Sequence, residues 1–170
     1  GVSDAFAPFE DLEIIRTGKL TLDDKPKLAR GRQAALAWSS IEGVVVLIDN
    51  QSAQIAETSA RAEEIFTYEL DGKPRVRLCK VASHQVAEPG DIIDFTIRFD
   101  NIGDHYIDKI VVQDSLSPRL EYVADSQKSS LQAEFHESGN DAGSSLLEWV
   151  FDQRVPAGSG GLIRFQARVR

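Results

Sequence analysis

The strongest constraint on the fold of this chain is a strict alternation of apolar and polar residues in its C-terminal half. Residues 93–99 read Ile-Asp-Phe-Thr-Ile-Arg-Phe, and residues 163–169 read Ile-Arg-Phe-Gln-Ala-Arg-Val. Successive side chains of a strand point to opposite faces of a sheet, so a period of two predicts strands. Strands with one apolar and one polar face are typical of antiparallel sheets that are solvated on one side.

Seven segments of this kind lie between residues 75 and 170, with turns and loops between them. They cover residues 76–78, 93–99, 110–112, 120–123, 131–135, 146–151 and 163–169. Seven short alternating strands in about 100 residues match an immunoglobulin-like sandwich. We therefore predict an all-β chain whose main unit is an immunoglobulin-like antiparallel β-sandwich.

The first 74 residues have a different pattern. Residues 12–15 are compatible with a strand, residues 44–48 read as a buried strand, and residues 65–70 have strand character. The charged stretch before residue 34 predicts mainly connecting chain, and residues 55–62 fit either helix or strand. We expect two units: a smaller β-rich N-terminal lobe at 1–74, with a partly irregular leading segment, and the sandwich at 75–170.

Several short pieces of the second unit occur in the order and spacing of a known family. They are Leu78-Cys79-Lys80-Val81, Glu88-Pro89-Gly90-Asp91, Phe95 to Phe99, Asn101-Ile102-Gly103-Asp104, Ile110 to Leu116, Leu120 to Val123, Leu147-Glu148-Trp149 and Val155 to Gly158. On these pieces residues 75–170 resemble the bacterial conserved repeat domain, domain of unknown function number eleven. The resemblance implies an immunoglobulin-like module of large secreted or cell-surface bacterial proteins, often in tandem and with no known catalytic activity. Residues 1–74 look similar to the segment before this module in planctomycete-type surface proteins.

Composition and motifs argue against several classes of function. A formal net charge of −8 argues against a nucleic-acid binder, which needs a basic face. No apolar run approaches the roughly 18 residues of a membrane span. The single cysteine, Cys79, excludes a disulfide framework within the chain and a cysteine-based zinc cluster. The sequence has neither a serine flanked by glycines in the hydrolase pattern nor a phosphate-binding glycine loop. We expect no enzyme and no cofactor.

Three polar residues occupy strand positions whose side chains should point into the core. Lys80 follows Val76 and Leu78 at steps of two, Asn101 continues the apolar positions 95–99, and Asp114 continues positions 110 and 112. A lysine, an asparagine and an acid at strand ends are the groups of a spontaneous Lys–Asn isopeptide crosslink, in which an apolar setting favours the neutral amine and the acid shuttles protons. The more common alternative is that Asn101 and Asp114 bind their own turns while Lys80 leaves the sheet at a bulge.

Four acidic or amide residues crowd one hairpin region, namely Asp100, Asn101, Asp104 and Asp108. Oxygen ligands at this density make Asp100, Asp104 and Asp108 weak calcium candidates. The spacing is not that of an EF-hand, and acidic residues on a solvated loop are the commoner explanation. We therefore predict no resident metal.

Two surface features remain. Cys79 reads as a small, partly buried hydrophobe, with an intermolecular disulfide as the alternative. The arginines of the last strand, together with Arg75 and Arg77 of the first, form a stripe on the solvated parity. In an acidic chain we expect this stripe to pair with acidic neighbours or to face the N-terminal lobe, which would pack on the first strand of the sandwich.

These observations favour a non-catalytic structural and adhesive module of a large bacterial cell-surface or secreted protein. Its partners would be other domains of surface proteins or components of the cell envelope, and its location extracellular or in the cell envelope. The alternative is a carbohydrate- or peptide-binding sandwich module. That alternative needs an exposed aromatic platform, for which Tyr106, Tyr122 and Phe135 are the candidates.

Overall fold

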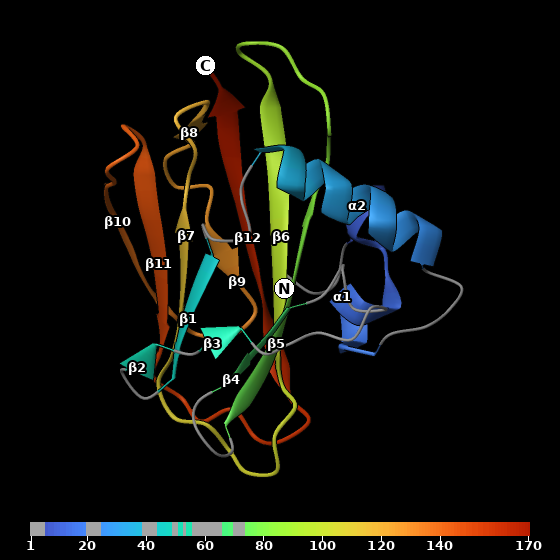
Figure 1. The fold of residues 1–170 in the computed structure, drawn as a ribbon, viewed down its shortest axis with the longest axis vertical. Coiled ribbons are helices and arrows are strands. Elements are labelled where there is room, and N and C mark those ends of the chain that lie inside the picture. The colour runs from blue at the N-terminus through green and yellow to red at the C-terminus, as the bar shows by residue number, and fades with distance from the viewer. Residues whose placement is uncertain are drawn as a thin grey trace.

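Six of the seven alternating segments form strands of two antiparallel sheets packed face to face, so the predicted β-sandwich is confirmed (Figure 1). The strand predicted at residues 131–135 is largely wrong, because only residues 134 and 135 lie in a strand. The computed structural model describes residues 6–19, 25–38, 44–48, 51–52, 54–55, 66–69 and 74–170. Its strands are β1 (Val44–Ile48), β2 (Gln51–Ser52), β3 (Gln54–Ile55), β4 (Phe66–Glu69), β5 (Arg75–Ala82), β6 (Ile92–Asn101), β7 (Ile110–Ser115), β8 (Leu120–Tyr122), β9 (Lys128–Ser129), β10 (Glu134–Gly139), β11 (Ser145–Phe151) and β12 (Gly160–Val169).

The strands divide between a five-stranded and a seven-stranded sheet. The first has the order β10-β11-β7-β1-β2. The second has the order β3-β4-β5-β6-β12-β8, and β9 pairs with β12 beside β8. The longest pairing joins β6 and β12, from Asp100 opposite Gly160 to Ile92 opposite Arg168.

The main core lies between the sheets and consists of the side chains on the apolar parity. Phe95 and Phe165 stack with ring centroids 5.1 Å apart, and Trp149 lies 5.6 Å from Phe165. Trp38 and Trp149 are both almost fully buried, as expected for core anchors. Burying such large apolar surfaces is the dominant favourable term in forming the sandwich.

Two helices and a short 3₁₀ turn precede the sandwich: η1 (Pro8–Glu10), α1 (Glu13–Thr17) and α2 (Lys25–Trp38). The strand predicted at residues 12–15 is wrong, because the chain turns into α1 there. Gly18 ends that helix in the left-handed conformation, with φ of 81°, and its N–H donates to the carbonyl of Ile14. The connecting chain predicted before residue 34 is wrong as well for residues 25–33, which belong to α2.

The predicted boundary at residue 74 does not separate two cores. β1 pairs with β7, and β4 pairs with β5, so both sheets contain strands from each side of this position. Trp38 belongs to the same buried cluster as the sandwich core. The strands predicted at 44–48 and 65–70 are confirmed as β1 and β4, with residues 65 and 70 outside the described part. Of the segment 55–62, only Ile55 is described, at the end of β3.

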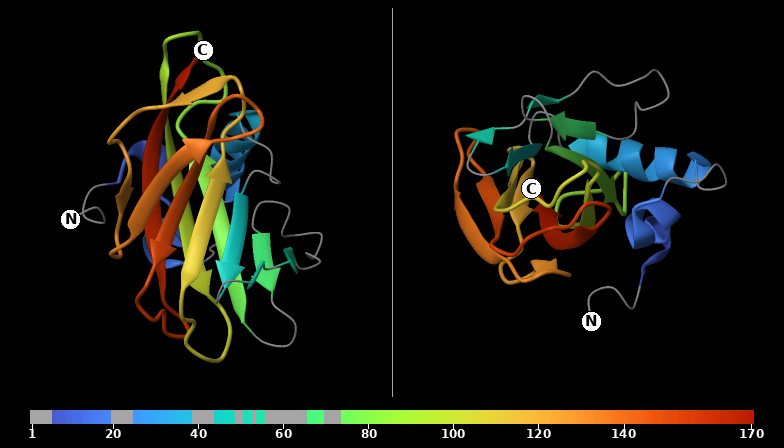
Figure 2. Two further views of the ribbon diagram at one scale, coloured as in Figure 1. Left: turned by 90° about the vertical axis from the view of Figure 1, so that its left-hand side faces the viewer. Right: turned by 90° about the horizontal axis from the view of Figure 1, so that it is seen from below.

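The helices cover the outer face of the seven-stranded sheet, opposite the five-stranded sheet, which produces a third layer (Figure 2). A second apolar cluster fills this interface: Leu12, Ile14, Ile15 and Leu28 from the N-terminal segment pack against Cys79, Val81 and Leu162 of the sheet. The outer face of the sheet is therefore partly apolar, and the N-terminal segment shields it from water. Within the described residues, no helix is long and apolar enough to cross a membrane.

Candidate functional site

Lys80 and Asp114 meet inside the sandwich. Lys80 lies on β5 and Asp114 on β7, so the pair connects the two sheets through the core. The Nζ of Lys80 donates to Oδ2 of Asp114 at 2.6 Å, and the two side chains are 4% and 0% exposed. The parity prediction is thus confirmed for both residues, and the alternative in which Lys80 leaves the sheet at a bulge is wrong.

The surroundings of this ion pair are apolar. The ammonium lies 4.8 Å from the ring centroid of Phe95 and 5.8 Å from that of Phe165, which gives it cation–π contacts. The cross-strand neighbours of Asp114 are the buried Val44 on β1 and Leu147 on β11. Charges in such surroundings cost several kcal/mol each in lost hydration, roughly, and they must be paired.

Asn101 is also buried, but it has a different role from Lys80 and Asp114. Its Nδ2 donates to the carbonyls of His105 and Val155 at 2.7 and 2.9 Å, and its Oδ1 accepts from the N–H of Gly103. It lies opposite Val76 on β5, whereas Lys80 lies opposite Ile97. Four residues along a strand correspond to about 13 Å. The structure therefore rules out a Lys80–Asn101 crosslink in this arrangement and supports the Asx-turn interpretation for Asn101.

The three calcium candidates do not come together. Asp100 is buried against Arg98, whose Nη2 lies 2.8 Å from its Oδ1. Asp108 lies 3.3 Å from Arg154, and Asp104 is exposed in the loop after β6. Among the described residues, no group of three histidine, cysteine, aspartate or glutamate side chains is arranged to hold a metal ion.

Part of the predicted arginine stripe faces the N-terminal segment, as expected. Arg164 on β12 binds the carboxylate of Glu10 with both Nη2 and Nε, at 2.9 and 3.0 Å. Arg77 on β5 donates to the carbonyl of Gly18. The hydroxyl of Thr96 on β6 donates to Glu10 at 2.7 Å. We call Glu10, Thr96 and Arg164 the latch, because these side chains join the N-terminal segment to two neighbouring strands.

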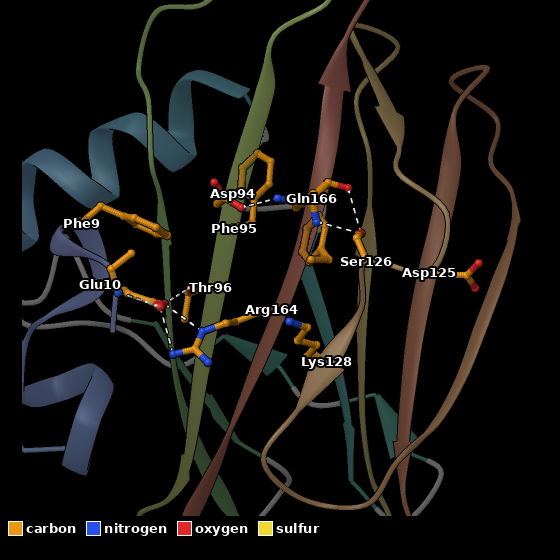
Figure 3. A pocket seen from close by; sticks show the side chains of 12 residues that line it. Phe9, Glu10, Asp94, Phe95, Thr96, Asp125, Ser126, Lys128, Arg164 and Gln166 are labelled. Atoms are coloured by element: carbon orange, nitrogen blue, oxygen red, sulfur yellow. Dashed lines mark hydrogen bonds and ion pairs between the residues drawn. The ribbon is translucent and has the colours of Figure 1, made fainter. Parts of the chain in front are cut away.

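A cavity of about 410 Å³ lies beside the latch, between the N-terminal segment and the strands (Figure 3). Its polar side chains bind one another: the amide of Gln166 donates to Asp94 at 2.8 Å, and the backbone N–H of Gln166 donates to the hydroxyl of Ser126 at 3.0 Å. Glu10 and Arg164 bind each other in the latch. The exposed Lys128 and Asp125 lie at its rim. These contacts join the N-terminal segment to the strands and the strands to the loop that contains Ser126.

The aromatic residues considered for a binding platform are not assembled into one. Tyr122 and Phe135 pack on each other, with ring centroids 5.6 Å apart, and Phe135 also contacts Trp149. The hydroxyl of Tyr122 donates to Gln127, and burial raises the pKa of this tyrosine above its ordinary value. Only Tyr106 of the three is exposed, with Arg154 over its ring.

Sequence reasoning missed Glu10 and Thr96 as site residues. Thr96 lies on the polar face of its strand, and the alternation pattern assigns that face to solvent unless another layer of the structure covers it. The covering layer was missed because α1 and α2 were missed. A helical signal was nevertheless present: Leu28, Arg32, Ala35 and Trp38 are spaced as one face of a helix, and all four are buried.

No protein-family model matches the chain, and no curated protein is significantly similar to it. The resemblance to the conserved repeat domain therefore stays a prediction.

Proposed function

We propose that this chain is a non-catalytic structural and adhesive module of a large bacterial cell-surface or secreted protein. The observation that carries the proposal is the use of the buried polar groups: in the described residues they join strand to strand and segment to sheet. Lys80 and Asp114 connect the sheets, Asn101 binds a loop to the strand, and the latch binds the N-terminal segment. The resemblance to a surface-protein module supports the extracellular or cell-envelope location.

The path of mechanical tension through the fold supports a load-bearing role. The N-terminal segment is bonded to β12 through Glu10 and Arg164, and β12 is the last strand of the sandwich in the sequence. β12 lies between β6 and β8, with backbone pairing to β6 along its length. Tension along β12 would load these hydrogen bonds together rather than one after another, and such loading resists separation.

Single-molecule stretching with handles at the two chain ends tests this role. We expect the N-terminal segment and the sandwich of the unmodified chain to unfold in one event. In an Arg164→Met variant, the N-terminal segment should be released first, at a lower force. Early release of that segment from the unmodified chain would contradict a load path through the latch.

The location is tested separately. Antibodies against the folded chain should label intact cells of the source organism, and protease added to those cells should remove the label. Labelling that requires permeabilised cells would contradict the surface assignment. Partners would then be sought among other domains of surface proteins and components of the envelope by crosslinking on intact cells.

A further inference from the structure

We infer that Lys80 and Asp114 are the two ends of an intramolecular isopeptide bond that forms after the chain folds. The two groups are already in contact, with Nζ 2.6 Å from Oδ2 of the carboxyl group that the amine would attack. Both side chains are almost fully buried, which keeps bulk water away from the two groups. The inference does not depend on the proposed function.

The reaction starts from the uncharged amine and the uncharged carboxylic acid. Proton transfer from Lys80 to Asp114 within the pair gives a neutral amine and a neutral carboxylic acid without changing the total charge. Two phenylalanine rings lie near Nζ of Lys80, and two buried aliphatic residues lie opposite Asp114 on the neighbouring strands. Proximity and a fixed orientation then replace a bimolecular encounter.

The covalent step balances without a further reactant. The lone pair of Nζ attacks the carboxyl carbon of Asp114, which forms one N–C bond and a tetrahedral centre. A proton moves from the nitrogen to an oxygen of the former carboxyl group, one C–O bond breaks, and one water leaves. Oδ1 of Asp114 has no hydrogen-bond partner in the described part of the chain and can accept the moving proton. The product is a neutral amide that joins β5 to β7 and removes both charges from the core.

The structure corrects the partner of the lysine. The sequence pattern suggests a Lys–Asn bond with the acid as helper, and that bond would release ammonia. The register places Asn101 too far along β6, and its amide is already bound to two carbonyls. A Lys80–Asp114 bond releases water instead.

The intact mass of the complete chain, measured under denaturing and reducing conditions, is the primary test. We expect a mass one water below that of the sequence, once incubation of the folded protein no longer changes the spectrum. Lys80→Met removes the amine and should restore the full mass. The matched control, Lys128→Met, removes an exposed lysine and should keep the loss of water.

Peptide mapping excludes other sources of the same mass change, such as a succinimide at Asp71-Gly72. An acylated Lys80 is not a trypsin site, so the map should contain residues 78–98 joined as a branched peptide to residues 110–119. This map uses the unmodified chain and therefore decides the question even if Lys80→Met does not fold. A full mass, or a water loss that maps elsewhere, overturns the inference.

Discussion

Glu10 and Arg164 are 154 residues apart in the sequence, yet their side chains form a two-contact ion pair on the outer face of the seven-stranded sheet. The same carboxylate accepts a hydrogen bond from Thr96, and only 3% of Glu10 is exposed. Two contacts between a guanidinium and a carboxylate stabilise the pair and also fix the relative orientation of the two groups. The pair therefore sets where the N-terminal segment sits on the sandwich.

Breaking this pair should open the layer beneath it. Arg164→Met leaves Glu10 buried without its cation, which typically costs about 3 to 5 kcal/mol in a fully buried setting and less for the partly exposed Arg164. The thiol of Cys79 lies in the apolar cluster under the N-terminal segment and is only 1% exposed. Since each 1.4 kcal/mol is a factor of ten, we expect labelling of Cys79 by a thiol reagent to become about 100-fold faster in native buffer.

The control for this experiment is Arg16→Met. Arg16 pairs with Asp11 and Glu13 on the exposed side of the same segment, where ion pairs contribute little. Its Cys79 labelling should match that of the unmodified chain. If Arg164→Met also leaves the rate unchanged, the latch does not hold the segment in place.

The sequence was sufficient for the strands but not for the layer that covers them. The alternation at residues 93–99 and 163–169 predicts strands, because the position of a residue in a strand determines which face of the sheet its side chain occupies. It also placed Lys80 and Asp114 inside. The short α1 was missed because Ile14 and Ile15 favour strand locally, and packing on the sheet overrides that preference. Contacts such as Glu10 with Arg164 depend on this docking, so no local pattern could predict them.

The polarity of Asn101 is required for the fold of the loop after β6. Asn101→Ala removes two donated hydrogen bonds and one accepted one at a fully buried position, leaving backbone groups unpaired. We expect the free energy of unfolding to fall by about 3 kcal/mol. Urea denaturation measures this loss. Asn140→Ala is the control: its amide donates to the carbonyls of Leu116 and Ser145 and to the hydroxyl of Ser115, and its Oδ1 accepts from the N–H groups of Ala142 and Ser144. This site is only half-buried and water can replace the lost bonds, so the loss should be smaller, about 1 to 2 kcal/mol.

The stability of the fold should fall at high pH because of Tyr122. Burial raises the pKa of Tyr122 above its ordinary value of 10.0, so the unfolded chain ionises at this residue before the folded chain does. Once the pH exceeds the pKa of tyrosine in the unfolded chain, the unfolded state binds fewer protons than the folded state. The free energy of unfolding therefore decreases as the pH rises through the raised pKa of the folded state. Below about pH 9 the contribution is constant.

Urea denaturation at a series of pH values checks this dependence. Tyr122→Phe should show a smaller fall between about pH 9 and about pH 11 than the unmodified chain, because it has no hydroxyl to ionise. Tyr106→Phe replaces an exposed tyrosine and should keep the full fall. If the free energy of unfolding falls equally with pH in all three proteins, ionisation of Tyr122 does not cause the loss of stability.

Among the described glycines, Gly160 leaves the least room for a side chain, at the start of β12 beside Asp100. A Cβ at this position would lie 1.9 Å from the carbonyl oxygen of Phe99 and 2.5 Å from Oδ1 of Asp100. The first of these atoms belongs to the backbone of β6 and cannot move without disturbing the ladder. Gly160→Ala should therefore lower the free energy of unfolding by about 3 kcal/mol or more.

Gly139 on β10 provides the matched control, because a Cβ there would have no atom within 4 Å. Gly139→Ala adds the same methyl group to an exposed strand and reduces the entropy of the unfolded chain, so its stability should be unchanged or slightly higher. Thermal and urea unfolding of the two variants compares them directly. A Gly160→Ala protein as stable as Gly139→Ala would mean that β6 and β12 do not approach each other this closely, and the register of the two strands would have to change at that end.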